Sequence, residues 1–275
     1  MKTIGMMAVA AAGLLAATGS VEAPLVGDLF DSTPGTQEAQ DWEWQGSIDR
    51  GDAVEIKGIN GRIKATGTSG GQVMVSAVKK GKKDDPADVR IDVVEHSGGV
   101  TICAVYPDAG GKKNECAPGD GGRLSNQDND VSVSFTVQVP AGVRFVGSTV
   151  NGDIEAGNLQ ADAAATTVNG DVRVSTSGLV KATTVNGSIQ ASMGRADWDG
   201  TVHFNTVNGS ITVNLPDGVN ADVSAATVNG GMETDFPLTV SGRFSMKSMK
   251  GTIGSGGRGL QLETVNGSIH LKKGG

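Results

Sequence analysis

The sequence contains few aromatic residues, and this limits the kind of core that it can form. Phe, Trp and Tyr make up 4% of the 275 residues, whereas glycine occurs 42 times, about twice its usual share of ~7%. Large globular cores are normally rich in aromatic side chains. We therefore expect many thin layers of small aliphatic side chains instead of one thick core.

Positive charge is also scarce, because 23 Lys and Arg residues stand against 30 Asp and Glu residues, for a net charge of -7. Binding of nucleic acid depends on clustered positive charge, so nucleic acid is not an expected partner. Residues 79–88 are rich in lysine, but they also contain acids and Pro86. We interpret this stretch as a solvated connection.

Long hydrophobic runs are missing after the first twenty residues. Residues 6–17 are apolar, follow Lys2 and are too few to span a bilayer comfortably. Small residues come next, so we predict a signal peptide over residues 1–19, with residue 23 as the alternative end. No later segment offers ~18 uninterrupted apolar residues. We expect a bacterial protein that is exported to the periplasm, the cell surface or the medium, with no transmembrane segment after signal cleavage.

Only two cysteines are present, Cys103 and Cys116, on either side of a turn-rich stretch. In an oxidising compartment such a pair usually forms a disulfide that closes a loop. Two metal ligands are the alternative, but the sequence has no CxxC motif and no histidine beside either cysteine. We predict the disulfide.

The remaining chain is divided into three parts. Residues 20–45 have no sustained period and are predicted to be a mobile leader, although Trp42 and Trp44 would share one face of an extended segment and could cap an end of the fold. Residues 46–145 alternate like strands between turn signals and contain the loop tied by the predicted disulfide. Residues 146–275 are predicted to be a repeat region. Helical periodicity is almost absent.

The tetrapeptide TVNG defines the repeat, and it begins at Thr149, Thr167, Thr184, Thr206, Thr227 and Thr264. A decayed copy is recognisable at residues 249–253, and GINGRI at residues 58–63 is an outlying relative. A period of about 20 residues is typical of a solenoid. We therefore predict stacked coils of β-strand.

Asn-Gly between strand-forming residues usually indicates a two-residue hairpin, but the flanking residues argue against it here. A hairpin would place one apolar and one polar residue on each face of every copy. If the chain instead turns a corner, Val185 and Ile189 can both point inward, and so can their counterparts in the other copies. The predicted solenoid core is Val150, Ile154, Val168, Val172, Val185, Ile189, Val207, Ile211, Val228, Met232, Val265 and Ile269.

Stacking would also explain why Asn and Gly recur. Equivalent asparagines of adjacent coils would lie ~4.8 Å apart, close enough for an amide ladder. Both residue types also tolerate the left-handed backbone that a bend can require. The predicted structural corner ladder is Asn151, Gly152, Asn169, Gly170, Asn186, Gly187, Asn208, Gly209, Asn229, Gly230, Asn266 and Gly267.

These features together resemble a known family. An export signal, VPAGVRF running into TVNGDI, and serial TVNGSI units ending in LETVNGSIHLKK are similar to the DUF4097 family, also called the "putative adhesin" or toast-rack domain, over residues 46–273. The resemblance implies a single-stranded, right-handed β-helix at the bacterial cell envelope, acting as an adhesin or as an envelope-stress module beside membrane proteins. It brings no catalytic residues. The absence of a transmembrane helix departs from the stress-module context.

Candidates for catalysis or metal binding are few. His96, His203 and His270 are far apart and have no metal-ligand spacing, and no nucleophile or phosphate-binding motif occurs. Asp153 and Asp171 would stack in successive repeats, like the acid pair of a polysaccharide-cleaving β-helix, but later copies carry serine at this position. We therefore expect no catalytic residues, no metal and no cofactor.

One further stretch could attract a cation. Residues 126–130 offer several hard oxygen ligands close together, but they lack the central glycine and the terminal glutamate of an EF-hand loop.

The sequence thus predicts an all-β, single-stranded β-helix with stacked TVNG corners, preceded by a more irregular β-rich part of the same sheet system. The expected function is that of a non-enzymatic, adhesin-like interaction surface for an unknown envelope protein or glycan. The stacked Thr/Asn/Ser/Asp corner or an open edge strand would be the binding face. A carbohydrate-active β-helix enzyme and a passive scaffold subunit of an envelope complex remain as alternatives.

Overall fold

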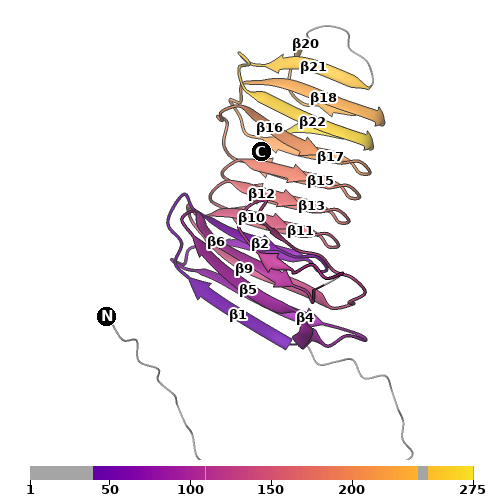
Figure 1. Cartoon of the computed structure of the whole chain (residues 1–275). Coiled ribbons are helices and arrows are strands. Elements are labelled where there is room, and N and C mark those ends of the chain that lie inside the picture. The colour runs from indigo at the N-terminus through magenta and orange to yellow at the C-terminus, as the bar shows by residue number, and fades with distance from the viewer. Residues whose placement is uncertain (1–39, 109, 241–246, 275) are drawn as a thin grey trace, which may run out of the picture. The chain divides into compact units, whose positions relative to one another are not determined.

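The computed structural model describes residues 40–108, 110–240 and 247–274, which belong to one unit of the chain, Thr36–Gly275 (Figure 1). The predicted signal peptide and residues 20–39 of the predicted leader lie outside the described residues. The last residues of that leader form strand β1 (Gln40–Gly46), so the folded part begins earlier than expected. Trp42 and Trp44 explain the difference, because both pack against the hydrophobic core from β1.

Two long sheets form the unit. Sheet A contains, in spatial order, β1, β4 (Val73–Lys80), β9 (Ser132–Pro140), β3 (Ile63–Thr68), β11 (Ile154–Leu159), β13 (Val172–Thr176), β15 (Ile189–Met193), β17 (Ile211–Leu215), β23 (Ile269–Lys273) and β19 (Met232–Thr234). Sheet B contains β20 (Thr239–Val240), β21 (Ser248–Ile253), β18 (Ala221–Asn229), β22 (Gly259–Asn266), β16 (Thr201–Asn205), β14 (Val180–Thr183), β12 (Ala163–Thr166), β10 (Arg144–Ser148), β2 (Ala53–Lys57), β6 (Gly99–Val105) and β5 (Arg90–His96).

Each coil of the repeat gives one strand to sheet B and, after a TVNG corner, one strand to sheet A. Neighbouring coils pair in parallel, as β11 does with β13 and β13 with β15. The coil of β2 and β3 continues the same stack through β10 and β11. The prediction of a β-solenoid that shares its sheets with the N-terminal part is therefore confirmed. Antiparallel strands close the stack at both ends, for example β4 on β9 and β21 on β18.

The coils are not stacked in strict sequence order. The last copy, in β22 and β23, is inserted between the fourth copy and the fifth, because β22 pairs with both β16 and β18. The supposed decayed copy at residues 249–253 forms no corner. It lies in β21, which runs antiparallel to β18.

The core between the sheets is thin and mainly aliphatic, as the composition predicts. Five of the six predicted positions after the corner are almost fully buried, namely Ile154, Val172, Ile189, Ile211 and Ile269. The sixth, Met232, is only half-buried, because its strand β19 is the edge of sheet A. Phe135, Phe145 and Phe204 are the largest apolar side chains that are fully buried.

The valines of the corners are not in the core, contrary to the prediction. Val150, Val168, Val185, Val207, Val228 and Val265 are 37–51% exposed. The preceding threonines point inward instead and are at most 5% exposed. Inward-pointing and outward-pointing residues alternate along the strand before each corner. Leu260 and Leu262 point inward, and Thr264 continues this alternation, so the change of face occurs after the valine, at Asn-Gly.

The corner glycines are required by a close approach of backbones. A Cβ on Gly187 would collide with the carbonyl oxygen of Gly170 in the neighbouring coil, and the other corner glycines meet the same obstacle. The left-handed backbone that we expected is absent from the six TVNG corners, where no asparagine has a positive φ, whereas Gly61 of the GINGRI copy has a φ of 127°. Gly209 and Gly267, at φ 159° and 158°, are essentially extended.

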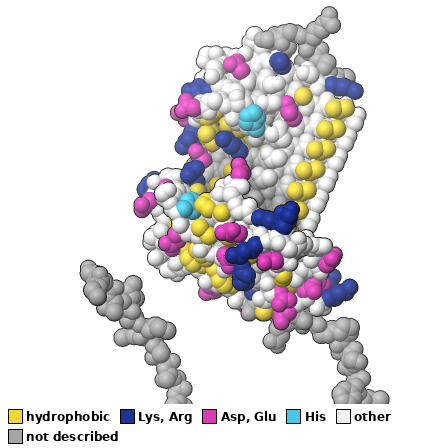
Figure 2. Space-filling view, in the orientation of Figure 1, with side chains coloured by type: hydrophobic (Ala, Val, Ile, Leu, Met, Phe, Trp, Pro, Cys, Tyr) yellow, Lys and Arg dark blue, Asp and Glu magenta, His cyan; other side chains and the backbone are white. Residues whose placement is uncertain are grey.

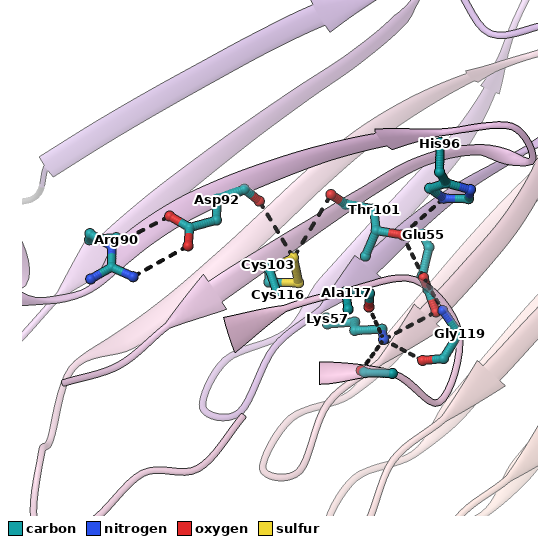
Figure 3. The surroundings of a disulfide bond; sticks show 11 residues. Glu55, Lys57, Arg90, Asp92, His96, Thr101, Cys103, Cys116, Ala117 and Gly119 are labelled. Atoms are coloured by element: carbon teal, nitrogen blue, oxygen red, sulfur yellow. Dashed lines mark hydrogen bonds and ion pairs between the residues drawn. A yellow bond between two sulfur atoms is a disulfide. The ribbon is translucent and has the colours of Figure 1, made fainter. Parts of the chain in front are cut away.

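A disulfide joins Cys103 of β6 to Cys116 of β7 (Glu115–Cys116) and ties a long loop to sheet B (Figure 3). The same loop holds Lys57, whose Nζ donates hydrogen bonds to the carbonyl oxygens of Ala117 (2.6 Å) and Gly119. The short strand β8 (Gly122–Arg123) pairs with β7 in this loop. A 3-10 turn, η1 (Pro86–Asp88), lies in the lysine-rich connection. The described residues contain no helix with the length and apolar character needed to cross a membrane.

The close approach at the corners can be tested with Gly187→Ala. The new methyl group must displace the backbone of the neighbouring coil, so we expect the free energy of unfolding to fall by about 3 kcal/mol or more. Gly71→Ala is the control, since nothing lies within 4 Å of its Cβ position and its φ is not left-handed. Equal stability of the two variants in urea denaturation would contradict this view of the corner.

The disulfide can be tested by removing both cysteines. Cys103→Ala/Cys116→Ala releases a loop with a sequence separation of 13 residues. The chain-entropy model gives a loss of about 3 kcal/mol in the free energy of unfolding for a loop of this size. The measurement is urea denaturation of the variant beside the oxidised protein, and an unchanged midpoint would show that other contacts hold the loop.

Candidate functional site

The threonines of the corners are engaged in bonds between coils. The Oγ1 of Thr184 donates to the carbonyl oxygen of Gly170 at 2.9 Å, and Thr206 bonds Gly187 in the same way. The bond recurs in every copy, from Thr149, Thr167, Thr264 and Thr227 to a glycine of the neighbouring coil. Burial of these hydroxyls is therefore compensated, as a buried polar group requires.

The asparagines of the corners form a continuous amide ladder. Each Nδ2 donates to the Oδ1 of the asparagine in the neighbouring coil at 2.7–2.8 Å. In spatial order the ladder is Asn60, Asn151, Asn169, Asn186, Asn208, Asn266 and Asn229. Asn60 extends it into the N-terminal part, at the outlying GINGRI copy.

The position after each corner glycine is engaged as well. Asp153 Oδ1 accepts a hydrogen bond from the backbone N–H of Asp171 at 2.8 Å, and Asp171 Oδ1 accepts one from Ser188 at 2.9 Å. Ser188 and Ser210 continue the same pattern. The polar corner groups that we predicted as a binding face are therefore bonded to neighbouring coils.

The valine side chains of the corners cannot form hydrogen bonds, and they make a row on the surface that we call the valine ridge. It consists, in spatial order, of Val150, Val168, Val185, Val207, Val265 and Val228. Figure 2 shows hydrophobic side chains in a single row along the stack.

A second feature is an open groove over the outer face of sheet A, which we call the sheet-A groove. Two depressions of about 720 and 460 Å³ form it, and they share Asn158, Ser175, Ser192 and Asn214. Residues of six parallel strands contribute, from Lys64 on β3 to Lys273 on β23. The groove therefore crosses the strands along the direction in which the coils stack.

The shared lining consists of neutral polar side chains that stack from coil to coil. Ser175 lies opposite Ser192, and Ser192 opposite Asn214, whose Nδ2 donates to Ser192 Oγ at 2.9 Å. Gln190 is exposed on the same face. Asn158 lies at an irregularity of β11 and has a left-handed φ of 55°, a conformation that asparagine tolerates. Irregularities of this kind often adjust where side chains point beside functional sites.

Charged side chains also line the groove, and Arg173 has carboxylates beside it. Arg173 bonds Asp171 at 2.7 Å and lies 3.9 Å from Glu155. Lys273 lies over the ring of Phe236, 5.7 Å from its centroid. Exposed pairs of this kind contribute little to stability. Lys64 and Asp217 are further charged residues of the lining.

The three histidines considered as metal ligands are not brought together. His96 lies beside Thr101 (3.2 Å), His270 beside Glu233 (3.1 Å), and His203 is exposed on β16. Among the described residues there is no group of three or more His, Cys, Asp or Glu side chains that could hold a metal ion.

The acidic stretch at residues 126–130 has a structural role. Hydrogen bonds from backbone N–H groups lower the pKa of the Asp130 carboxyl, chiefly that of Asp84, then those of Lys82 and Lys83. In the same part of the chain, burial raises the pKa of Tyr106 to about 12, and its hydroxyl donates to the carbonyl oxygen of Val131.

Sequence reasoning missed the groove, although a signal was present. Ser175, Ser192 and Asn214 each follow the threonine of their repeat by the same number of residues, so an alignment of the repeats would place them in one column. The polar character of this column was hidden because its members differ, with Gly157 and Lys272 at the same place in other copies. The choice of the corner as binding face also rested on valines that were assigned to the core.

The bond from threonine to glycine can be tested with Thr184→Val, which keeps the shape and removes the hydroxyl. The Gly170 carbonyl loses its buried donor, so we expect the free energy of unfolding to fall by about 1–3 kcal/mol. Thr212→Val on the outer face of β17 is the control and should change stability little, since Thr212 is only half-buried. A stability loss no larger than that of the control would contradict a structural role for the hydroxyl.

Comparison with known proteins gives the following similarities. No curated protein matches the chain. Among solved structures, a "putative cell adhesion protein" from Clostridium sporogenes aligns with 10% identity and a TM-score of 0.48, covering 86% of this chain and 100% of the other. A "putative adhesin" from Bacteroides fragilis aligns with 13% identity and a TM-score of 0.31, covering 84% and 97%. The family model of toastrack DUF4097 matches residues 51–272, most of the sequence. The chain therefore belongs to the toastrack DUF4097 family.

Proposed function

We propose that this protein is an exported, non-enzymatic, adhesin-like component of the bacterial cell envelope that binds an extended glycan chain along the sheet-A groove. The observation that carries the proposal is the groove itself, which crosses the strands of sheet A and presents a neutral polar side chain at four successive steps, Asn158, Ser175, Ser192 and Asn214. An extended polymer can contact many such steps, whereas a small molecule would contact only a few.

The chemistry of the groove favours a glycan over a polypeptide. Amide and hydroxyl groups, such as those of Asn158, Gln190 and Ser192, can both donate and accept hydrogen bonds, as sugar hydroxyls require. A peptide helix would need an apolar strip, and an added peptide strand would need a free sheet edge. The groove lies over the middle strands of sheet A, between paired neighbours on both sides.

Two features support a binding role over a hydrolytic one. The groove is open, while catalytic sites usually exclude water around the reacting groups. The stacked acids Asp153 and Asp171 are engaged by backbone N–H groups, and Asp171 also pairs with Arg173. We therefore assign these acids a structural role and do not propose the carbohydrate-active enzyme.

Export to an oxidising compartment accords with two features of the chain. The disulfide between Cys103 and Cys116 is of the kind that persists in periplasmic and extracellular proteins. The apolar N-terminal stretch has the pattern of a secretory signal.

A glycan array probed with the mature protein, followed by calorimetry on the best hit, tests this function. We expect Gln190→Ala/Asn214→Ala to weaken binding about tenfold or more, because each lost hydrogen bond removes about 1 kcal/mol. The control Gln261→Ala/Asn205→Ala removes the same groups from sheet B, which lies outside the groove. Equal loss in both variants, or capture of a protein partner and no glycan, would overturn the proposal.

A further inference from the structure

The valine ridge is a continuous exposed apolar feature that the fold leaves unexplained. Its six valines are 37–51% exposed, although valine is usually buried in folded proteins. The threonine, asparagine and glycine beside each valine have defined contacts with the neighbouring coil. A strand-forming polar residue such as threonine would serve the backbone equally well at the valine position.

The surroundings of the ridge have the character of an interface. The asparagine ladder beside it is neutral, and its amides are bonded to one another. The centres of protein interfaces are poor in charged residues and enriched in apolar contacts. The ridge is continued at its N-terminal end by Ile59, which occupies the valine position of the GINGRI copy. The chain itself covers this residue, because Ile59 is only 7% exposed.

We propose that the valine ridge pairs with the valine ridge of a second copy of this chain. The spacing of the ridge carries the argument. Its rungs follow the spacing of strands in a sheet, ~4.8 Å, so a partner that contacts all six valines must present apolar groups at the same interval. A second copy meets this condition without further adjustment, and side chains on matched β-ladders can interdigitate without water.

The two ridges run in opposite directions. The chain covers the N-terminal end of each ridge at Ile59. Two parallel ridges would bring these covered ends against each other, whereas two antiparallel ridges keep them apart. A two-fold axis then passes between Val185 and Val207, the third and fourth rungs, and the contact surface is the same on both copies. In this arrangement Val168 faces Val265 of the second copy, and Val150 faces Val228.

The pairing is weak for single molecules in solution. Six partly exposed valines provide less than the ~800 Å² per partner of a standard interface. Many copies held on one cell surface, or on two facing surfaces, would form many such contacts at once, and their combined strength would then be much larger. This homotypic contact does not depend on the sheet-A groove, so it can fail while glycan binding holds, and the reverse.

Cysteine cross-linking tests the proposal and its direction. Val168→Cys and Val265→Cys are made separately in the full mature chain, mixed and mildly oxidised. We expect a cross-linked dimer in the mixture at least tenfold above either variant alone, because Val168 and its own equivalent would lie three rungs, or ~14 Å, apart. A mixture of Lys181→Cys and Gln190→Cys, both exposed on the outer faces of the sheets, gives the background.

A second measurement uses no new cysteine. Sedimentation of the mature protein at increasing concentration should show a rising average mass, and Val185→Thr/Val207→Thr should abolish the rise while keeping the β-branched shape. Cross-linking no greater than the background, equal cross-linking of a single variant with itself, or ridge-dependent binding to lipid vesicles without self-association would overturn the proposal.

Discussion

The structure depends on how closely the backbones approach each other at the corners. Each TVNG corner rests on the carbonyl of a corner glycine in the neighbouring coil, where no Cβ would fit. This proximity lets the threonine hydroxyl of one coil reach the glycine carbonyl of the next, and it brings the asparagine amides within 2.7–2.8 Å of each other. Replacing the threonine, the asparagine or the glycine would disturb contacts in two coils, which is a physical reason for the repetition of these three residues.

The two long sheets follow from this corner. Because the chain turns with its inner face preserved, small aliphatic residues such as Ala156, Ala191 and Val213 can fill most of a narrow interior with few aromatic side chains. The same geometry leaves regular columns of side chains outside. The column at the corner forms the valine ridge, and the column at Ser175, Ser192 and Asn214 lines the sheet-A groove. Both candidate surfaces are therefore products of the stacking itself.

Much of this architecture could be predicted from the sequence, and the failures have specific causes. Recurrence of TVNG predicted the coils, and the apolar residue after each corner, such as Ile189, was assigned correctly to the core. The valines were misassigned because alternation alone does not say whether the change of face occurs before or after them. The hydrogen bond from Thr184 to Gly170 decides that the change of face occurs after the valine, because it satisfies a buried hydroxyl. This bond joins two coils, so one copy of the repeat does not predict it. The insertion of the last coil between β16 and β18 is likewise a long-range choice that no local pattern encodes.

Hydrogen exchange at the corner amides tests the central claim most directly. The N–H of Asn186 donates to Val168 at 2.7 Å, and that of Gly187 donates to Asn208 at 2.9 Å, so corners should be as tightly bonded as strands. We predict that these two amides, measured by NMR in the mature protein, are protected to the same degree as Ile189 in β15. Exchange as fast as that of the exposed Gly71 would contradict the account, because corners that open freely could not hold the coils in register.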